Sequence, residues 1–178
     1  MMNTAALKSY IHAVENFPKP GIRFRDITPL LAAPEAFMAA ITHMADATSA
    51  HDVQALVGIE ARGFIFASAM AQHMQLPFFL VRKAGKLPRT TASIEYALEY
   101  GTDRLEIHLG DIQQPMKVAL VDDVLATGGT ANAAAGLLEQ CGVEVACTSF
   151  LMELNGLGGR AVLNKYPVLP LLQYELEE

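Results

Sequence analysis

The chain has 178 residues, 52% of them hydrophobic, and a mean hydropathy of +0.25, which is enough apolar surface for one sizeable core. This composition excludes a disordered, collagen-like or disulfide-stapled chain and predicts a single domain over residues 1–178. The formal net charge of −6 argues against sequence-independent binding to nucleic acid.

The N-terminal part is expected to begin with a helix over Leu7–Asn16. The following stretch, Phe17–Asp26, is predicted to be a loop because Pro18, Pro20 and Gly21 break helices.

A second helix is predicted from Pro34, a favourable first-turn residue, to about Ser49. Its apolar residues recur at helical spacing, at Phe37, Ala40, Ile41, Met44 and Ala47.

Short apolar runs rich in Val, Leu and Phe predict strands at Ala55–Ile59, Pro77–Val81, Lys117–Val121 and Glu144–Leu151. Runs without polar alternation suit strands that are covered on both faces, as in a parallel sheet. Helical patterns lie between the runs, at Gly63–Met74 and Thr130–Gln140. This alternation predicts an α/β fold with a mostly parallel central sheet flanked by helices.

One segment, Arg82–Asp103, does not fit this alternation. A connection this long inside a compact domain is usually functional or mobile. Eight of the thirteen Lys and Arg residues gather in this segment, in the early loop and at Arg62. They either surround a small anion or form solvated charged surface, and the sequence pattern alone leaves both interpretations open.

No targeting or membrane segment is recognised. Met1–Tyr10 lacks the charged start and apolar run of a signal peptide, and polar residues interrupt Phe64–Val81. Cys141 and Cys147 match no zinc or redox spacing. We therefore expect a cytoplasmic protein without a membrane partner, in which both thiols are small core residues.

The strongest chemical signal is a strand, turn and helix over Met116–Thr130. In open α/β sheets, ligands bind at the carboxyl ends of strands. Gly128 and Gly129 allow a tight turn whose N–H groups approach a ligand, and the following helix directs its positive end to the same place. These requirements fit a phosphate monoester.

Asp122 and Asp123 directly precede this turn. Carboxylates beside a phosphate suit sugar hydroxyls, which are donors, or Mg²⁺ bridging ligand oxygens. The alternative is purely structural, with Asp123 starting a turn and Thr127 or Thr130 capping a helix. Neither a Walker A loop nor a Gly-x-Gly-x-x-Gly sequence is present.

Val121–Thr130 resembles the motif by which type I phosphoribosyltransferases bind 5-phosphoribosyl 1-pyrophosphate (PRPP). Other stretches resemble the members of that family that use adenine: Phe17–Leu30, Gly58–Phe64, Arg82–Pro88 and Leu98–Gly101. The resemblance implies the type I phosphoribosyltransferase fold, with a small N-terminal hood at about 10–33 and a flexible catalytic loop at about 82–103.

The resemblance also implies the reaction of adenine with PRPP to give AMP and pyrophosphate, in purine salvage. It implies Mg²⁺ as the cofactor, bound through PRPP and water with no ligand directly from the protein, and a homodimer. Two alternatives stay open, a transferase for another base such as hypoxanthine or xanthine, and a regulator that keeps the PRPP site as a sensor.

The resemblance implies Glu99, Arg62 and Lys86 as catalytic residues, with Glu99 exchanging a proton with N7 of the base. The residues that it implies for PRPP or AMP binding are Ala61, Arg62, Arg82, Lys83, Lys86, Tyr100, Asp122, Asp123, Ala126, Thr127, Gly128, Gly129 and Thr130. For adenine it implies Phe24 and Val124 on the two faces of the ring and the main chain of Arg23 and Arg25 at its edge. Taken alone, Phe24 is more typical of a core residue and Arg62 of a surface ion pair.

Overall fold

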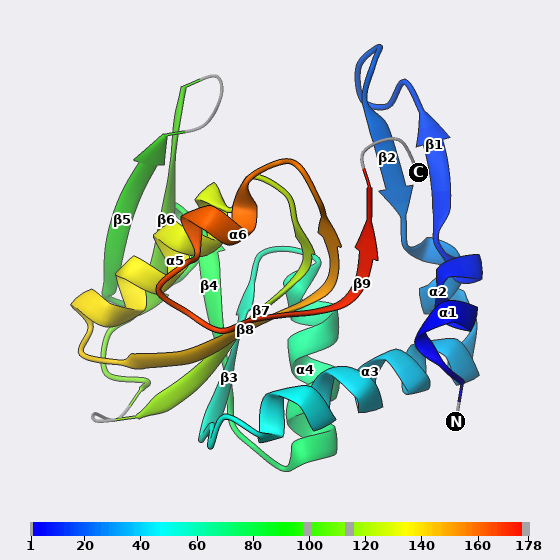
Figure 1. The fold of residues 1–178 in the computed structure, drawn as a ribbon. Coiled ribbons are helices and arrows are strands. Elements are labelled where there is room, and N and C mark those ends of the chain that lie inside the picture. Colours follow the sequence, from blue (N-terminus) through cyan, green and yellow to red (C-terminus); the bar gives the residue numbers. More distant parts are fainter. Residues whose placement is uncertain (1, 98–100, 113–115, 176–178) are drawn as a thin grey trace.

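The computed structural model describes residues 2–97, 101–112 and 116–175 (Figure 1). The strands of its central sheet are β3 (Ala55–Ile59), β4 (Phe78–Lys83), β5 (Thr91–Ala97), β6 (Thr102–His108), β7 (Lys117–Leu125), β8 (Glu144–Leu154) and β9 (Val168–Tyr174). In the described residues they form a seven-stranded sheet in the order β5-β6-β4-β3-β7-β8-β9. From β4 to β9 neighbouring strands are parallel, whereas β6 is antiparallel to both β4 and β5.

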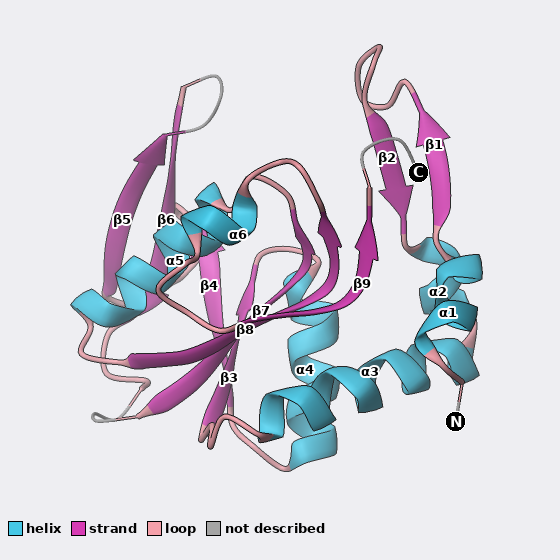
Figure 2. Ribbon diagram, viewed as in Figure 1, coloured by secondary structure: helices cyan, strands magenta, loops and turns pink. Residues whose placement is uncertain are grey.

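Helices cover both faces of this sheet (Figure 2). The helices are α1 (Thr4–Leu7), α2 (Thr28–Ala32), α3 (Pro34–Ser49), α4 (Gly63–Met74), α5 (Gly129–Gln140) and α6 (Gly159–Val162), and a 3₁₀ turn spans Lys8–Tyr10. The core on one face contains residues of α3 and α4, and the core on the other contains residues of α5. Among the helices of the described ranges, none has the length and apolar character that a membrane span requires.

Strand β3 explains why the sequence shows apolar runs without alternation. All five of its residues are buried. Leu56 packs into the core below α3 and α4, while its neighbours Ala55 and Val57 pack into the core below α5. Because both faces of the sheet are covered, both sets of side chains must be apolar.

Several predicted elements are confirmed. The bounds of α3, α4 and β3 are those expected from the sequence, and α5 begins one residue earlier, at Gly129. Strands β7 and β8 run further than expected, to Leu125 and Leu154. Asp122 and Asp123, which directly follow the predicted strand, therefore lie within β7.

The predicted helix over Leu7–Asn16 is wrong. Helix α1 ends at Leu7, and His12–Glu15 form strand β1. Strand β2 (Arg23–Asp26) pairs with β1 in antiparallel register, so the predicted loop also contains a strand. The two strands form a separate sheet in the hood, and Figure 1 shows this sheet beside the end of β9. Arg25 lies there with its guanidinium carbon 4.2 Å from the ring centre of Tyr174.

The segment 82–103 also differs from the expected loop. Its described part contains the end of β4, all of β5 and the start of β6, and β5 pairs with β6 as an antiparallel hairpin. Ile94 and Tyr96 of β5 pack against the core that includes α5. This packing holds the hairpin on the sheet edge. Strand β9 was not among the predicted strands either, and it pairs in parallel with β8.

Candidate active site

Strand β7 delivers two carboxylates and then a tight turn to the edge of the sheet. Gly128 has a φ of +82°, and a Cβ there would lie 2.9 Å from the carbonyl oxygen of Gly159, so only glycine fits. Helix α5 starts at the next residue, with Asn132 N–H donating to the Gly128 carbonyl at 2.9 Å. The first N–H groups of a helix have no intrahelical acceptor and favour an anion.

Asp123 is buried, with 4% of its surface exposed, and it forms an ion pair with Arg62. The Arg62 Nε lies 2.8 Å from Asp123 Oδ2. Burial raises the pKa of Asp123, and the guanidinium of Arg62 opposes that rise. Arg62 directly precedes α4, so the turn after β3 brings its charge to the end of β7.

Asp122 lies against the start of α4. Its Oδ1 accepts the N–H of Asp123 at 2.9 Å. A Cβ on Gly63 would come 2.9 Å from this oxygen and 2.6 Å from the carbonyl oxygen of Val121. Burial and then the negative charge of Asp123 raise the pKa of Asp122 well above its ordinary value of 3.8. The site therefore holds two neighbouring acids, of which only Asp123 has a close cationic partner among the described contacts.

A cavity of about 330 Å³ opens beside these acids. The predicted site residues that line it are Ala61, Arg62, Lys83, Asp122, Asp123, Val124, Ala126, Thr127, Gly128, Gly129 and Thr130. The structure thus brings together the strand end, the Gly/Thr turn and the turn after β3, as the sequence predicts.

Among the described residues predicted for PRPP or for catalysis, Arg82 and Lys86 do not line this cavity. The guanidinium of Arg82 binds Glu60, with Nε 3.1 Å from Oε2 and Nη2 3.0 Å from Oε1. Its Nη1 donates to the carbonyl oxygen of Lys86 at 3.2 Å, and the Lys86 residue is exposed. The N–H of Lys83 also donates to Glu60, at 3.0 Å. Although burial opposes the shift, these hydrogen bonds hold the pKa of Glu60 below its ordinary value.

The hairpin adds wall residues that the sequence analysis missed. Tyr96 and Asp103 line the cavity. The Tyr96 hydroxyl donates to Asp103 Oδ2 at 3.4 Å and accepts from Thr130 Oγ1 at 3.5 Å. Lys83 Nζ lies 3.4 Å from the same Asp103 oxygen. The alternation of Ile94 and Tyr96 with exposed residues is the sequence signal that indicates this strand. Glu99 and Tyr100, both predicted site residues, lie outside the described residues.

A second cavity, of about 570 Å³, lies below the hood. All four residues predicted for the flat base line it: Arg23, Phe24, Arg25 and Val124. Apolar residues missed by the sequence analysis complete the wall, at Ile22, Met152, Leu154 and Leu157. The side chain of Arg23 binds Glu15, and that of Arg25 lies over Tyr174.

The two cavities share a wall. Arg62, Asp123, Val124, Ala126 and Thr127 line both. The guanidinium carbon of Arg62 lies 5.4 Å from the ring centre of Phe24, close enough for a cation–π contact. Phe17 supports Phe24 edge-on, with 5.2 Å between ring centres. A polar cavity and a more apolar cavity are therefore continuous across Asp123 and Arg62.

The site provides carboxylate oxygens, but the described ranges contain no group of three or more His, Cys, Asp or Glu side chains placed to hold a metal ion. Mg²⁺ commonly takes one or two carboxylates together with substrate phosphates and water. Asp122 and Asp123 would reach such an ion through its water of hydration, from which the oxygens of carboxylates accept hydrogen bonds.

Comparisons with known proteins agree with this geometry. Residues 28–167 match the model of the phosphoribosyl transferase domain family. An adenine phosphoribosyltransferase of Pseudothermotoga lettingae is 52% identical over 94% of this chain and 99% of its own length. One of Francisella tularensis subsp. novicida is 50% identical over 97% of this chain and its full length.

Solved structures show the same relationship. Adenine phosphoribosyltransferase of Thermoanaerobacter pseudethanolicus superposes with a TM-score of 0.94 at 42% identity, covering 97% of this chain and 100% of its own. The Saccharomyces cerevisiae enzyme, solved with an imino-altritol bisphosphate and adenine, gives 0.89 at 39% identity, covering 95% and 98%. These matches confirm the predicted type I phosphoribosyltransferase fold. The chain belongs to the adenine phosphoribosyltransferase family.

Proposed function

We propose that the protein transfers the 5-phosphoribosyl group of PRPP to adenine and produces AMP and pyrophosphate, in purine salvage. One observation carries the proposal: a polar cavity with two carboxylates and a helix N-terminus shares a wall with a more apolar cavity below Phe24. A sugar phosphate and a flat base fit this division. In the reaction the bond from C1′ to N9 forms, the bond from C1′ to the pyrophosphate oxygen breaks, and the proton of the adenine imidazole ring passes to solvent or to the leaving pyrophosphate.

We assign the ribose phosphate to the first cavity. The 2′- and 3′-hydroxyls would donate to the carboxylates of Asp122 and Asp123. The 5′-phosphate would accept from the turn 126–130, which lies at the N-terminus of α5. This assignment is supported by the mixture of acceptors and backbone donors in one small cavity.

We assign adenine to the second cavity. Phe24 and Val124 would contact the two faces of the ring, which is supported by their positions in its wall. The side chains of Arg23 and Arg25 are directed to Glu15 and Tyr174, which leaves the main chain of β2 as the part that would contact the base edge.

The pyrophosphate would leave near Arg62 and Lys83, because both line the first cavity. Cations there stabilise the charge that builds on the leaving oxygen. Arg62 contacts Asp123 through Nε, and its guanidinium has other donors for the pyrophosphate. Arg82 binds Glu60 through Nε and Nη2, so it must exchange that partner to contact the pyrophosphate. We propose that Arg82 and Lys86 approach the pyrophosphate once Arg82 has released Glu60.

We propose Mg²⁺ as the cofactor, bound through PRPP and water, with Asp122 and Asp123 as acceptors for the hydrating water. The fit rests on the two neighbouring carboxylates in the cavity. When bound, Mg²⁺ supplies neutralisation of the negative charge on the pyrophosphate oxygens.

The experiment is an assay of base specificity. The purified protein is incubated with PRPP, Mg²⁺ and one purine base at a time, and the nucleotide formed is identified by chromatography. We expect AMP from adenine and no nucleotide from hypoxanthine, guanine or xanthine. The double variant Asp122→Asn/Asp123→Asn is the negative control, since it should not bind PRPP. Formation of IMP or XMP would contradict the choice of base, and PRPP binding without any product would favour a sensor.

We further propose that the protein is a cytoplasmic homodimer. A reducing compartment is supported by the two free thiols. Burial raises the pKa of Cys147 to about 12, which makes this thiol unreactive. The homodimer is supported by the family resemblance. Sedimentation velocity at several protein concentrations measures the oligomeric state. A monomer at micromolar concentration would contradict it.

A further inference from the structure

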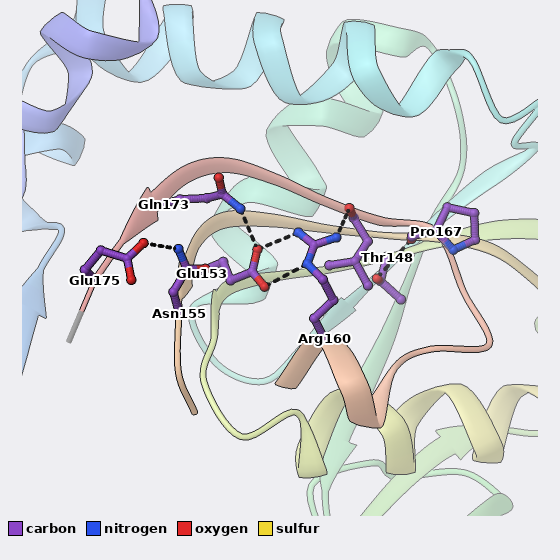
Figure 3. Close-up of polar contacts among 8 residues, drawn as sticks. Thr148, Glu153, Asn155, Arg160, Pro167, Gln173 and Glu175 are labelled. Carbon is purple, nitrogen blue, oxygen red and sulfur yellow. Dashed lines mark hydrogen bonds and ion pairs between the residues drawn. The ribbon is translucent and has the colours of Figure 1, made fainter. Parts of the chain in front are cut away.

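A buried carboxylate behind the phosphate turn carries a network that the proposed function does not use. The side chain of Glu153, in β8, is 6% exposed. Arg160 binds it with two parallel contacts, Nε to Oε1 at 3.0 Å and Nη2 to Oε2. Gln173 Nε2 donates to Oε2 at 3.0 Å. Figure 3 shows these side chains converging from α6, β8 and β9.

This network lies beside the base of the phosphate turn. Glu153 is in register with Leu125, the last residue of β7, on one side and with Gln173 of β9 on the other. Arg160 belongs to α6, and its Nη1 also donates to the carbonyl oxygen of Val168 at 3.4 Å. One guanidinium therefore ties α6 to the end of β8 and the start of β9.

The start of α6 is in direct backbone contact with the turn. A Cβ on Gly159 would lie 2.3 Å from the carbonyl oxygen of Ala126 and 2.8 Å from Leu125 Cδ1. A Cβ on Gly128 would lie 2.9 Å from the carbonyl oxygen of Gly159. Since no side chain separates the two segments, any displacement of Gly159 is transmitted to the turn.

Helix α6 cannot hold this position by itself. It has four residues, and a single helical turn is not stable in isolation. Arg160 directly follows Gly159, and its planar guanidinium fixes both distance and orientation relative to Glu153. Although burial opposes the shift, the hydrogen bonds from Arg160 keep the pKa of Glu153 below its ordinary value.

We propose that Arg160, acting through Glu153, is a positioning residue for the 5′-phosphate of PRPP and AMP. It holds Gly159 against the turn 126–130 so that the backbone N–H groups of the turn keep the geometry that a phosphate requires. The proposal rests on the proposed function, because that function assigns the 5′-phosphate to this turn. Arg160 lines neither described cavity, so it acts through the turn and not by contact with the ligand.

The test compares two inhibitors that occupy different parts of the site. Arg160→Ala and Arg160→Lys are assayed with ribose 5-phosphate and with pyrophosphate, each as a competitor of PRPP. We expect Arg160→Ala to raise the inhibition constant of ribose 5-phosphate about tenfold and that of pyrophosphate by less than about twofold. Arg160→Lys keeps the charge but loses the two parallel contacts with the carboxylate. It should therefore weaken the binding of ribose 5-phosphate by less than Arg160→Ala does, and again leave the binding of pyrophosphate nearly unchanged.

Lys165→Ala is the matched control. Lys165 follows α6 in the chain and binds a different carboxylate, Glu139, at 2.6 Å, so its loss should leave both inhibition constants unchanged. Glu153→Gln should reproduce the selectivity of Arg160→Ala, and the double variant should be no worse than Arg160→Ala alone, because both changes break one interaction.

An equal loss of affinity for both inhibitors would show that the whole site is loosened and would overturn the positioning role. Unchanged binding of ribose 5-phosphate would overturn it too. If Arg160→Ala does not fold, Arg160→Lys decides by the same comparison. If the unmodified chain makes no AMP from adenine, the proposed function fails. If the unmodified chain makes AMP and the Arg160 variants bind ribose 5-phosphate normally, only the positioning role fails.

Discussion

At the scale of single residues, Asp122 is held in an unfavourable state at neutral pH. Burial and the charge of Asp123 raise its pKa above the ordinary value of 3.8, so the folded protein binds a proton there more tightly than the unfolded chain. The charge therefore costs more stability as the pH rises from 3.8 through the raised folded value. Asp122→Asn removes this charge and keeps the oxygen that accepts the Asp123 N–H. We expect the melting temperature at pH 7 to rise by about 2–4 °C, while ribose 5-phosphate binding is lost.

Thermal unfolding at pH 7 and at pH 4 measures this effect. The gain should shrink at pH 4, where the parent carboxyl is increasingly protonated. Asp46→Asn is the control, because it removes the same charge from an exposed position on α3. A variant that is less stable than the parent at pH 7 would contradict the unfavourable burial of Asp122.

Glu99 allows a second prediction at this scale, although it lies outside the described residues. If its carboxyl exchanges a proton with N7, Glu99→Leu should lower kcat by about 100-fold and leave the KM for PRPP nearly unchanged. Glu95→Leu, at an exposed position of β5, is the control for an added apolar side chain. Equal losses in kcat and in PRPP affinity would contradict the acid–base role.

The predicted site residues whose proximity follows from the chain itself are those fixed by local spacing. Asp122 and Asp123 lie on β7 and Gly128 lies in the turn directly before α5, so their proximity follows from their spacing in the chain. The partner of Arg82 was not readable, because Glu60 lies 22 residues away and meets it only through the pairing of β3 with β4. The local residue pattern does not show with which carboxylate an arginine forms an ion pair.

At the scale of elements, two helical glycines predict opposite effects of one substitution. In α5, a Cβ on Gly136 would meet Ile94 Cδ1 at 3.5 Å, an ordinary van der Waals contact. Gly136→Ala should stabilise the protein by about 0.5–1 kcal/mol, because it removes backbone freedom from the unfolded chain. At the start of α4, a Cβ on Gly63 would lie 2.6 Å from the Val121 carbonyl oxygen. Gly63→Ala should destabilise by about 1–3 kcal/mol.

Urea unfolding of the two variants measures both changes, and each variant serves as the control for the other because the chemical change is the same. Gly63→Ala should also weaken the binding of ribose 5-phosphate, because the added Cβ displaces Asp122. Gly136→Ala should leave this binding unchanged. Two variants of equal stability would show that α4 can shift away from β7 without cost.

The elements predicted from sequence were those whose pattern is set by local burial. Strand β3 has the expected bounds because all five of its residues are buried, and helix α3 because one face of it packs into the core. Strand β1 could not be predicted in this way, because its four residues are exposed and it pairs with β2 across a turn that contains two prolines. Strand β5 failed because its mixed polar sequence gains its apolar contacts from α5, an element about forty residues further along the chain.

At the scale of the whole molecule, two sheets contribute different halves of the site. The central sheet supplies the acids, the turn and the helix end, and the two-stranded sheet of the hood supplies Phe24. They meet at Arg62, which binds Asp123 and lies against the Phe24 ring. Although the formal net charge of the chain is −6, the cations Arg62 and Lys83 line the first cavity.

This division predicts that the two substrates respond separately to a change in the hood. Phe24 lines the second cavity and not the first, and stacking of an aromatic ring on a base is worth about 1–3 kcal/mol. Phe24→Ala should therefore raise the KM for adenine by about 5- to 100-fold and leave inhibition by ribose 5-phosphate unchanged. Val14→Ala changes the residue paired with Phe24 on β1, which lines neither cavity, and should change neither constant. If Phe24→Ala weakened both ligands equally, the hood and the central sheet would bind them as one unit, and the assignment of one cavity to each substrate would be wrong.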